Sequence, residues 1–153
     1  MTQDRSATYQ RVWFITGSSA GVGRALTDAV LASGERAVVT ARMPERIRDL
    51  IERYPAQALV LELDVTRPDQ VRQAVHGAID RFGHIDVLVD NEGLSAALAM
   101  ELAPLGIKVI RIEPPSSNGH PPGDSAAAAE SIIAAVDADP AEISNREQKR
   151  EVR

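Results

Sequence analysis

Apolar residues along the chain follow two alternating patterns. Short, nearly continuous runs of β-branched and apolar residues are separated by longer segments in which apolar residues recur three and four positions apart. The short runs are typical of strands covered on both faces, and the longer segments are typical of amphipathic helices. The pattern predicts strands at residues 11–16, 36–41, 58–63, 85–89 and 106–112.

Helices are predicted between these strands. The first, at residues 22–32, is followed by Gly34, and glycine commonly ends a helix. A second begins near Pro44, because the N–H that proline lacks has no partner in a first helical turn. In the third, at residues 66–82, Thr66 is expected to cap the start. Two further helices are expected at residues 94–103 and 125–136. The inward face of the third helix is expected to hold Val71, Val75, Ala78, Ile79 and Phe82.

This succession predicts an α/β fold. It is a doubly wound, Rossmann-like parallel sheet of about five strands in the order 3-2-1-4-5, with helices on both faces. Residues 11–136 are expected to form a single dinucleotide-binding domain between a flexible N-terminus at 1–10 and a polar C-terminal tail at 137–153. In such sheets ligands bind at the carboxyl ends of the strands, where the strand order reverses. The expected site therefore follows the first strand.

Composition narrows the function classes. The 153 residues are 44% hydrophobic and 25% charged, as in an ordinary soluble globular domain. No apolar run approaches the roughly 20 residues that cross a bilayer, so we expect no membrane partner and a cytoplasmic location. The net charge of −5 argues against a nucleic-acid partner, and the absence of cysteine excludes disulfides and thiolate chemistry.

Glycines gather where the first strand meets the first helix, in the segment TGSSAGVG. Gly17 lets the chain leave the strand in a tight turn, Gly21 removes a side chain where a pyrophosphate must approach, and Gly23 lets the helix lie close to the sheet. The unpaired amides at the helix start and the helix dipole would then hold the anion. A glycine cluster can also be a plain turn, but its place between strand and helix favours phosphate binding.

Four segments together resemble the short-chain dehydrogenase/reductase family. They are TGSSAGVG, then LDV after the third strand, then DVLVDNEG, and ELAPLGIKVIRIEPP, and they occur in the family's order. The resemblance covers the chain from Val12 to about Val136 and implies an oxidoreductase that uses a nicotinamide dinucleotide and a small carbonyl or alcohol substrate. It implies a cofactor site made of Thr16, Gly17, Ser18, Ser19, Gly21, Val22 and Gly23 at the pyrophosphate, Asp64 and Val65 at the adenine, and Asn91 near the adenosine side.

Two residues depart from the family pattern beside Asn91. The family has Asn-Asn-Ala-Gly where this chain has Asp90, Asn91, Glu92 and Gly93. Carboxylates beside a bound diphosphate are unfavourable unless they are turned to solvent. Asp90 and Glu92 could also bind a metal, but no other residue at ligand spacing supports them, and we predict no metal site.

The end of the second strand bears on the choice of cofactor. An NAD site has a carboxylate there to accept from the ribose hydroxyls, whereas the 2′-phosphate of NADP favours a cation. This chain has Ala41 at the acidic position and Arg42 next to it. The expected cofactor is therefore NADP rather than NAD. The alternative is that Arg42 is a solvated surface charge, like Arg46 and Arg48 after it.

The family's catalytic residues have no counterpart in this chain. Family members use a serine and a tyrosine whose pKa is lowered by a lysine four residues later, on the same helix face. Neither Tyr9 nor Tyr54 is followed by lysine at that spacing, and the two lysines are Lys108 and Lys149. We therefore name no catalytic residue. Other residues that could take part in catalysis have simpler explanations: Ser95 as a helix-start residue, and His76, His84 and His120 as surface histidines. Ser116 or Ser117 could touch a nicotinamide amide or could simply be solvated.

The absence has a position in the sequence. Up to Asn91 the chain resembles the family's fourth strand, and from Glu92 or Gly93 it resembles the later part of the catalytic helix. Several dozen residues of the family pattern are absent at this join: a crossover helix, the strand with the serine, and the first turns of the catalytic helix. The next strand is expected to lie beside the fourth, which a right-handed crossover permits. The helix at 94–103 is expected to pack on the sheet, with a homodimer contact as the alternative.

Three functions remain open from the sequence. The first is NADP(H) binding with absent or impaired carbonyl or alcohol oxidoreduction. The second is an NADP-dependent oxidoreductase with a proton donor that the family does not use, because hydride transfer is the chemistry of the cofactor. The third is an interaction or structural module that does not bind nucleotide.

Overall fold

The computed structural model describes residues 10–91, 93, 100, 102–111 and 125–138. Their strands form one parallel sheet of five strands in the order β3-β2-β1-β4-β5, which confirms the predicted fold and strand order. The strands are β1 (Val12–Ile15), β2 (Arg36–Ala41), β3 (Ala58–Glu62), β4 (Val87–Asp90) and β5 (Lys108–Arg111). The helices are α2 (Gly21–Ala32), α3 (Asp49–Arg53), α4 (Pro68–Phe82) and α6 (Ser125–Ala138), with the 3₁₀ turns η1 (Pro44–Ile47) and η2 (Ala103–Leu105).

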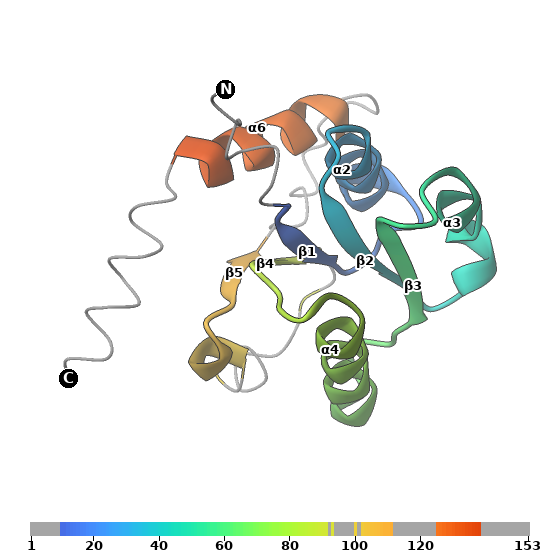
Figure 1. Ribbon diagram of the computed structural model, residues 1–153, viewed down its shortest axis with the longest axis vertical. Coiled ribbons are helices and arrows are strands. Elements are labelled where there is room, and N and C mark those ends of the chain that lie inside the picture. Colours follow the sequence, from blue (N-terminus) through green and yellow to red (C-terminus); the bar gives the residue numbers. More distant parts are fainter. Residues whose placement is uncertain (1–9, 92, 94–99, 101, 112–124, 139–153) are drawn as a thin grey trace, which may run out of the picture.

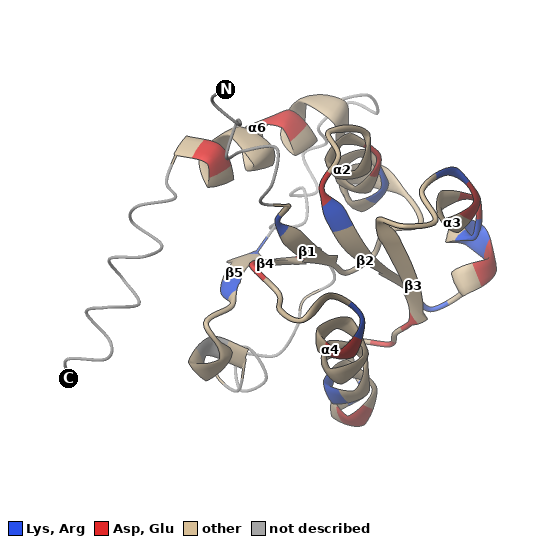
Figure 2. Cartoon of the chain, in the orientation of Figure 1, with Lys and Arg blue, Asp and Glu red and all other residues tan. Residues whose placement is uncertain are grey.

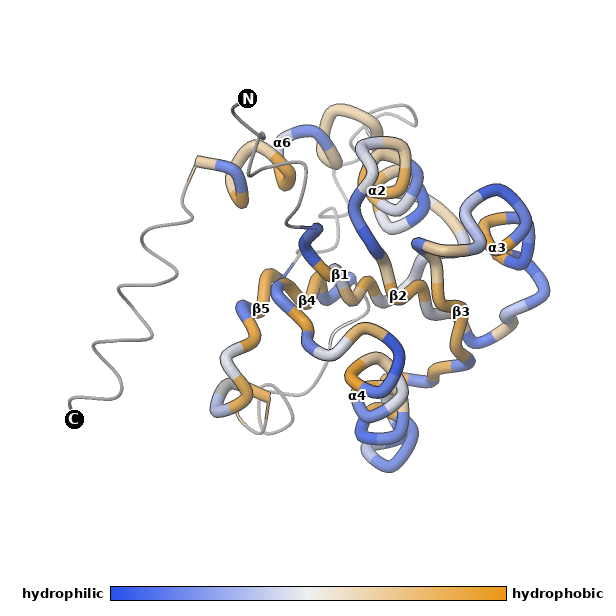
Figure 3. Tube along the Cα trace, in the orientation of Figure 1, coloured by the Kyte–Doolittle hydropathy of each residue, from blue (hydrophilic) through white to orange (hydrophobic). Residues whose placement is uncertain are grey.

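Helices cover both faces of the sheet. Helix α4 lies on one side, and α2 with α6 lies on the other (Figure 1). On the α4 side, the buried core joins Val12, Phe14 and Leu88 of the strands to Val71 and Ala78 of the helix. Hydropathy along the chain follows this arrangement, because the strands are mostly apolar while hydrophilic and hydrophobic residues alternate along α4 (Figure 3).

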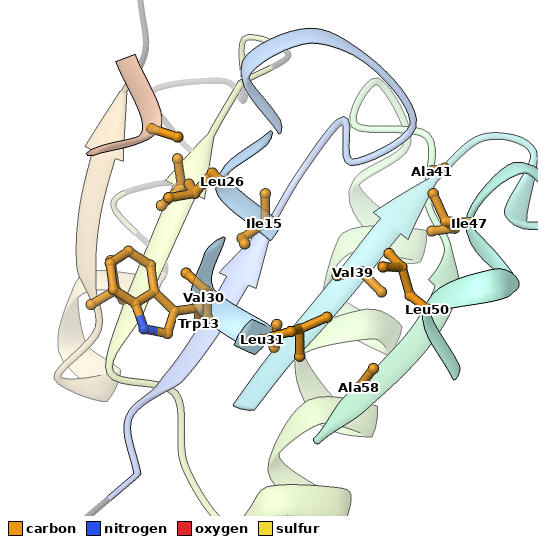
Figure 4. Packing of buried hydrophobic residues seen from close by; sticks show 14 of the residues in the cluster. Trp13, Ile15, Leu26, Val30, Leu31, Val39, Ala41, Ile47, Leu50 and Ala58 are labelled. Atoms are coloured by element: carbon orange, nitrogen blue, oxygen red, sulfur yellow. The ribbon is translucent and has the colours of Figure 1, made fainter. Parts of the chain in front are cut away.

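The second core lies between the sheet and α2, η1, α3 and α6. Trp13 and Ile15 of β1 pack with Leu26 of α2, and Ile47 and Leu50 close the core beyond β2 (Figure 4). Helix α6 contributes four side chains to the same core. Two are buried, Ala129 and Val136, and two are half-buried, Ile132 and Ile133. All four residues of β1 are fully buried, as expected for the central strand of a sheet covered on both faces.

Strand β5 lies directly beside β4. The two strands are parallel, with Val87 opposite Lys108 and Asp90 opposite Arg111. The predicted helix at 94–103 falls largely outside the described residues. Of its described members, Leu102 is 4% exposed and packs into the core on the α4 side, whereas Met100 is 74% exposed.

Three local predictions need correction or extension. Thr66 does not cap α4, because Arg67 is the N-cap residue and no side chain caps the helix; the Thr66 hydroxyl donates to Asp64 Oδ1 at 2.6 Å. The helix expected from Pro44 is broken into η1 and the short α3. Helix α6 continues two residues past its predicted end, and there Arg11 pairs with Asp137 at 2.5 Å.

None of the described helices is long and apolar enough to span a bilayer.

Candidate functional site

The turn between β1 and α2 is fixed by backbone conformation and by buried hydroxyls. Gly17 and Gly21 have positive φ angles of 65° and 60°, a region that favours glycine. Ser18 is fully buried, its hydroxyl donates to the carbonyl of Ile15 at 3.1 Å, and its N–H donates to the carbonyl of Thr40 at 3.0 Å. The turn is therefore tied to the ends of both β1 and β2.

Gly23 is required by the close approach of α2 to this turn. A Cβ atom at this position would lie 2.0 Å from the carbonyl oxygen of Gly17. The first amides of α2 have no partner within the helix, no side chain caps them, and no acidic residue lies in the first turn. These amides and the helix dipole make this end of α2 suited to an anion. Ser19 and Val22 are half-buried beside it.

Thr16 and Asn91 brace the turn against β4. The Asn91 N–H donates to Thr16 Oγ1 at 2.8 Å, and Asn91 Nδ2 donates to the carbonyl of Gly17 at 3.4 Å. The N–H of Thr16 in turn donates to the carbonyl of Val89 at 3.0 Å. Thr16 and Asn91 therefore lie at the glycine turn, where they contact its backbone, the backbone of β4 and each other.

Asp64 lies where β3 leads into α4. Its N–H donates to Gln70 Oε1 at 2.9 Å, and its Oδ1 accepts from both the N–H and the hydroxyl of Thr66. The hydrogen bond from the Thr66 hydroxyl is the main reason that the pKa of Asp64 is lowered, and the charges of Arg42 and Arg67 lower it further. Val65 is half-buried and packs on the core of the α4 side.

A cavity of about 170 Å³ opens at this edge of the sheet. Its lining residues are Arg42, Glu62, Asp64, Arg67 and Gln70. They come from the end of β2, the end of β3 and the start of α4, where basic and acidic segments lie next to one another (Figure 2). Arg42 and Asp64 were expected site residues from the sequence, whereas the other three were not.

The missed residues carried a signal in the sequence. Glu62, Arg67 and Gln70 flank Asp64 in the segment ELDVTRPDQ, at the carboxyl end of a predicted strand. The rule that ligands bind at this end of the strands applies to these residues as well as to Arg42. The register adds a further relation, because Glu62 pairs with Ala41, the position that lacks a carboxylate.

The other side of the site differs from the family pattern. Asp90, at the end of β4, is 2% exposed rather than turned to solvent. Of the other residues considered there, Glu92, Ser95, Ser116, Ser117 and His120 fall outside the described residues. In the part of the chain that the structure describes, no group of three or more potential metal ligands occurs.

The described tyrosine and lysine both lie away from the expected site. Tyr54 precedes β3, and Lys108 is the first residue of β5, so both are at the amino edge of the sheet. His76 is exposed on α4, and His84 Nε2 lies 3.0 Å from Asp86 Oδ2 at that same amino edge. None of these four residues faces the glycine turn at the carboxyl edge.

Comparison with known proteins gives a consistent match over the first part of the chain. The family model described as short chain dehydrogenase matches residues 11–97. An oxidoreductase of Botryotinia fuckeliana (strain B05.10) is 40% identical over 92 residues, which are 60% of this chain and 34% of that protein. The matching segment spans about a third of the length of the curated relatives.

Two solved structures extend the comparison to the fold. A short-chain dehydrogenase from Streptomyces avermitilis has a TM-score of 0.62 at 26% identity, covering 90% of this chain and 62% of that chain. The C-domain of a bacterial malonyl-CoA reductase, solved with NADP, has a TM-score of 0.51 at 25% identity, covering 54% of this chain and 14% of that chain.

Proposed function

Because this chain belongs to the short-chain dehydrogenase/reductase family, whose members bind NAD(P), we propose that it binds NADP(H) at the carboxyl edge of β1, β2 and β3. The observation that carries the proposal is the contact of Gly23 with the glycine turn. An added Cβ would lie 2.0 Å from the carbonyl oxygen of Gly17, so this part of the turn accepts glycine alone. Because no side chain is present at Gly23, the first amides of α2 are left open to a pyrophosphate.

The residues at the adenosine end fit a phosphorylated ribose. Ala41 is 3% exposed and has no carboxylate for the ribose hydroxyls, while Arg42 beside it is exposed and lines the cavity. A guanidinium is suited to a phosphate because it presents several N–H donors in a planar fork. Asp64 and Val65 would flank the adenine, and Asn91 with Thr16 would hold the turn in place.

We further propose that the chain does not use the family's mechanism of carbonyl or alcohol oxidoreduction. When bound, the cofactor supplies or accepts a hydride. The chain would have to supply a proton donor at the substrate oxygen, and no tyrosine of this sequence has a lysine four residues later. The proposed role is therefore binding of NADP(H), with oxidoreduction absent or impaired.

A titration followed by a turnover assay tests both parts. The full chain is titrated with NADPH and with NADH, followed by nucleotide fluorescence, and is then given a panel of aldehydes and ketones in the same cuvette. We expect tighter binding of NADPH than of NADH, a loss of about tenfold in NADPH affinity with Arg42→Ala, and no oxidation of NADPH. Arg46→Ala is the matched control, since Arg46 is an exposed arginine of η1 that does not line the cavity.

Each contrary outcome favours a different function. Oxidation of NADPH with any member of the panel would establish an oxidoreductase with another proton donor. Absence of binding to both nucleotides would favour an interaction or structural module. Equal binding of NADPH and NADH, unchanged by Arg42→Ala, would refute the assignment of NADP.

A further inference from the structure

We propose that Arg67 is a second cation for the 2′-phosphate of NADP(H), that it acts together with Arg42, and that Glu62 opposes both. This inference rests on the proposed function, because it assigns the chemistry of one end of the same site. It adds two specificity-determining residues that the sequence pattern did not identify.

The two guanidiniums of the cavity differ from the paired arginines elsewhere. Arg11 is bound to Glu35 and Asp137, and Arg24 is bound to Asp28 and Asp49. By contrast, neither the Arg42 nor the Arg67 guanidinium has a hydrogen bond or an ion pair to any residue that the structure describes.

The backbone holds Arg67 in a fixed position at the cavity. Its N–H donates to the carbonyl of Asp64 at 3.0 Å, and its own carbonyl accepts from the N–H groups of Gln70 and Val71. Arg67 is also the N-cap of α4, a helix of 15 residues, and its side chain caps no amide there. The side chain is thus not required for the start of the helix and lines the cavity together with Arg42.

The size of the cavity restricts what it can hold. At about 170 Å³ it exceeds the roughly 10–15 Å³ that one ordered water needs. It is smaller than the roughly 300–1,000 Å³ of a site for a whole drug-sized ligand. The cavity opens to solvent, and its volume suits one group of a larger ligand whose remainder would extend beyond these lining residues. Two cations from two elements favour a phosphate monoester, which has three acceptor oxygens and a charge of about −1.5 to −2 at pH 7.

The carboxylates of the cavity set a limit on this preference. Asp64 Oδ1 is occupied by two hydrogen bonds from Thr66, whereas Glu62 is exposed and no described residue forms an ion pair with it. Glu62 is also the register partner of Ala41, so its charge lies beside the ribose position of the proposed site. A like charge near the phosphate weakens binding, and removal of that charge should strengthen it.

The test uses fragments that lack the nicotinamide. Adenosine 2′,5′-bisphosphate, adenosine 3′,5′-bisphosphate and 5′-AMP are titrated into the full chain by calorimetry, with NADPH as the reference ligand. We expect the 2′,5′ compound to bind most tightly, and Arg67→Ala to weaken it about tenfold while leaving 5′-AMP within about twofold. Arg67→Lys should restore part of the loss, because lysine keeps the charge but not the fork. Arg46→Ala serves as the control, and thermal unfolding of each variant verifies the fold.

Glu62→Gln gives a result of opposite sign. It should tighten the 2′,5′ compound about three- to tenfold and leave 5′-AMP within about twofold, because only the former places a phosphate at the cavity. A structural effect of either substitution would change both ligands together.

The outcomes separate this inference from the proposed function. If Arg42→Ala weakens the 2′,5′ compound while Arg67→Ala does not, NADP(H) binding stands and the role of Arg67 is refuted. If Arg67→Ala weakens all three fragments equally, the residue is structural and the inference is also refuted. If NADPH itself does not bind, the proposed function fails first. If the 3′,5′ compound binds as tightly as the 2′,5′ compound, the cavity has no specificity for the 2′ position and the inference is wrong.

Discussion

The sheet has two halves that differ in how they are built. The half of β3, β2 and β1 carries the glycine turn, the cavity and buried strands, and its site residues fall within positions 16–70 together with the brace from Asn91. The half of β4 and β5 has a half-buried edge strand and, at its carboxyl end, Asp90 in place of the family's asparagine. The glycine turn and the cavity are thus concentrated in one half of the sheet.

In the proposed function, cofactor binding and catalysis are separable parts of this fold. The proposed cofactor site is formed by short segments that follow β1, β2 and β3, each adjacent to the strand that positions it. No tyrosine of this sequence is followed by a lysine four residues later, which is the spacing that the family resemblance leads one to expect of a catalytic site. The parallel sheet continues without interruption from β1 through β4 to β5, because β5 pairs directly with β4.

The largest predicted effect compares one residue type in the two halves. Ile15 of β1 and Ile110 of β5 lie in one row across the sheet, each opposite Val89, and both pack on the core of the α2 side. Ile15 is fully buried and Ile110 is half-buried. Ile15→Ala should lower the free energy of unfolding by about 3–4 kcal/mol and Ile110→Ala by about 1–2 kcal/mol, measured by urea unfolding. Equal losses would show that β5 is as integral to the core as β1.

The second prediction concerns the glycine turn. Gly23→Ala forces a displacement of α2 or of the turn and should cost about 1–3 kcal/mol, together with most of the affinity for NADPH. Gly77→Ala is the matched control in the interior of α4, where the added Cβ would lie 3.6 Å from Leu61 Cδ1, an ordinary contact. It should stabilise the protein by up to about 1 kcal/mol. A Gly23→Ala variant with unchanged NADPH affinity would contradict the role of this contact.

The third prediction addresses the attachment of α6 to β1. Asp137→Ala removes the ion pair with Arg11, whose guanidinium also lies 5.4 Å from the ring centre of Trp13. Because Asp137 is 56% exposed, the expected loss is about 0.5–1 kcal/mol. Trp13 is the single tryptophan, so its fluorescence reports unfolding around this contact. Glu130→Ala, an exposed change on the same helix, should leave the unfolding midpoint within error, and an equal shift in both variants would exclude a specific role for the pair.

The smallest predicted effect is a dependence on pH at the pair between α2 and α3. The hydrogen bond from Arg24 lowers the pKa of Asp49 in the folded protein. The contribution of the pair is therefore complete above the unfolded pKa of about 3.9 and disappears as the pH falls through the lower folded value. Arg24→Ala should lower the melting temperature by about 1–2 °C at pH 7 and by less at pH 3. A constant difference at both pH values would mean that packing rather than charge is responsible.

The bounds of an element could be predicted where a run of apolar residues lies between residues that end a strand. The bounds of β2 agree with the prediction because its buried run lies between Gly34, with a φ of 92°, and Pro44. The prediction that Thr66 caps α4 was wrong because the helix begins one residue later than that prediction requires. Arg67 is the N-cap residue instead, and the N–H and hydroxyl of Thr66 both donate to the Asp64 carboxylate in the turn before the helix.

In the candidate site, the conformation of the glycine turn could be predicted because it depends on the backbone. Gly17 and Gly21 have the positive φ angles that favour glycine, and Gly23 leaves out a Cβ that would meet the carbonyl oxygen of Gly17. The cavity could not be predicted in the same way, because the meeting of Glu62, Arg67 and Gln70 with Arg42 depends on where α4 enters beside β2 and β3. Spacing along the chain does not contain that direction.

The central position of β1 has a consequence for synthesis of the chain. The N–H of Val12 donates to Asp86 Oδ2, 74 positions later, and Thr16 is braced by Asn91, 75 positions later. At about 5–20 residues per second, the ribosome needs about 4–15 s to make that interval. Throughout this time one edge of a fully apolar strand has no β4 to pair with and is open to other chains. Of the five strands, β1 is thus synthesised first, and its pairing with β4 can form only after the fourth strand has been synthesised.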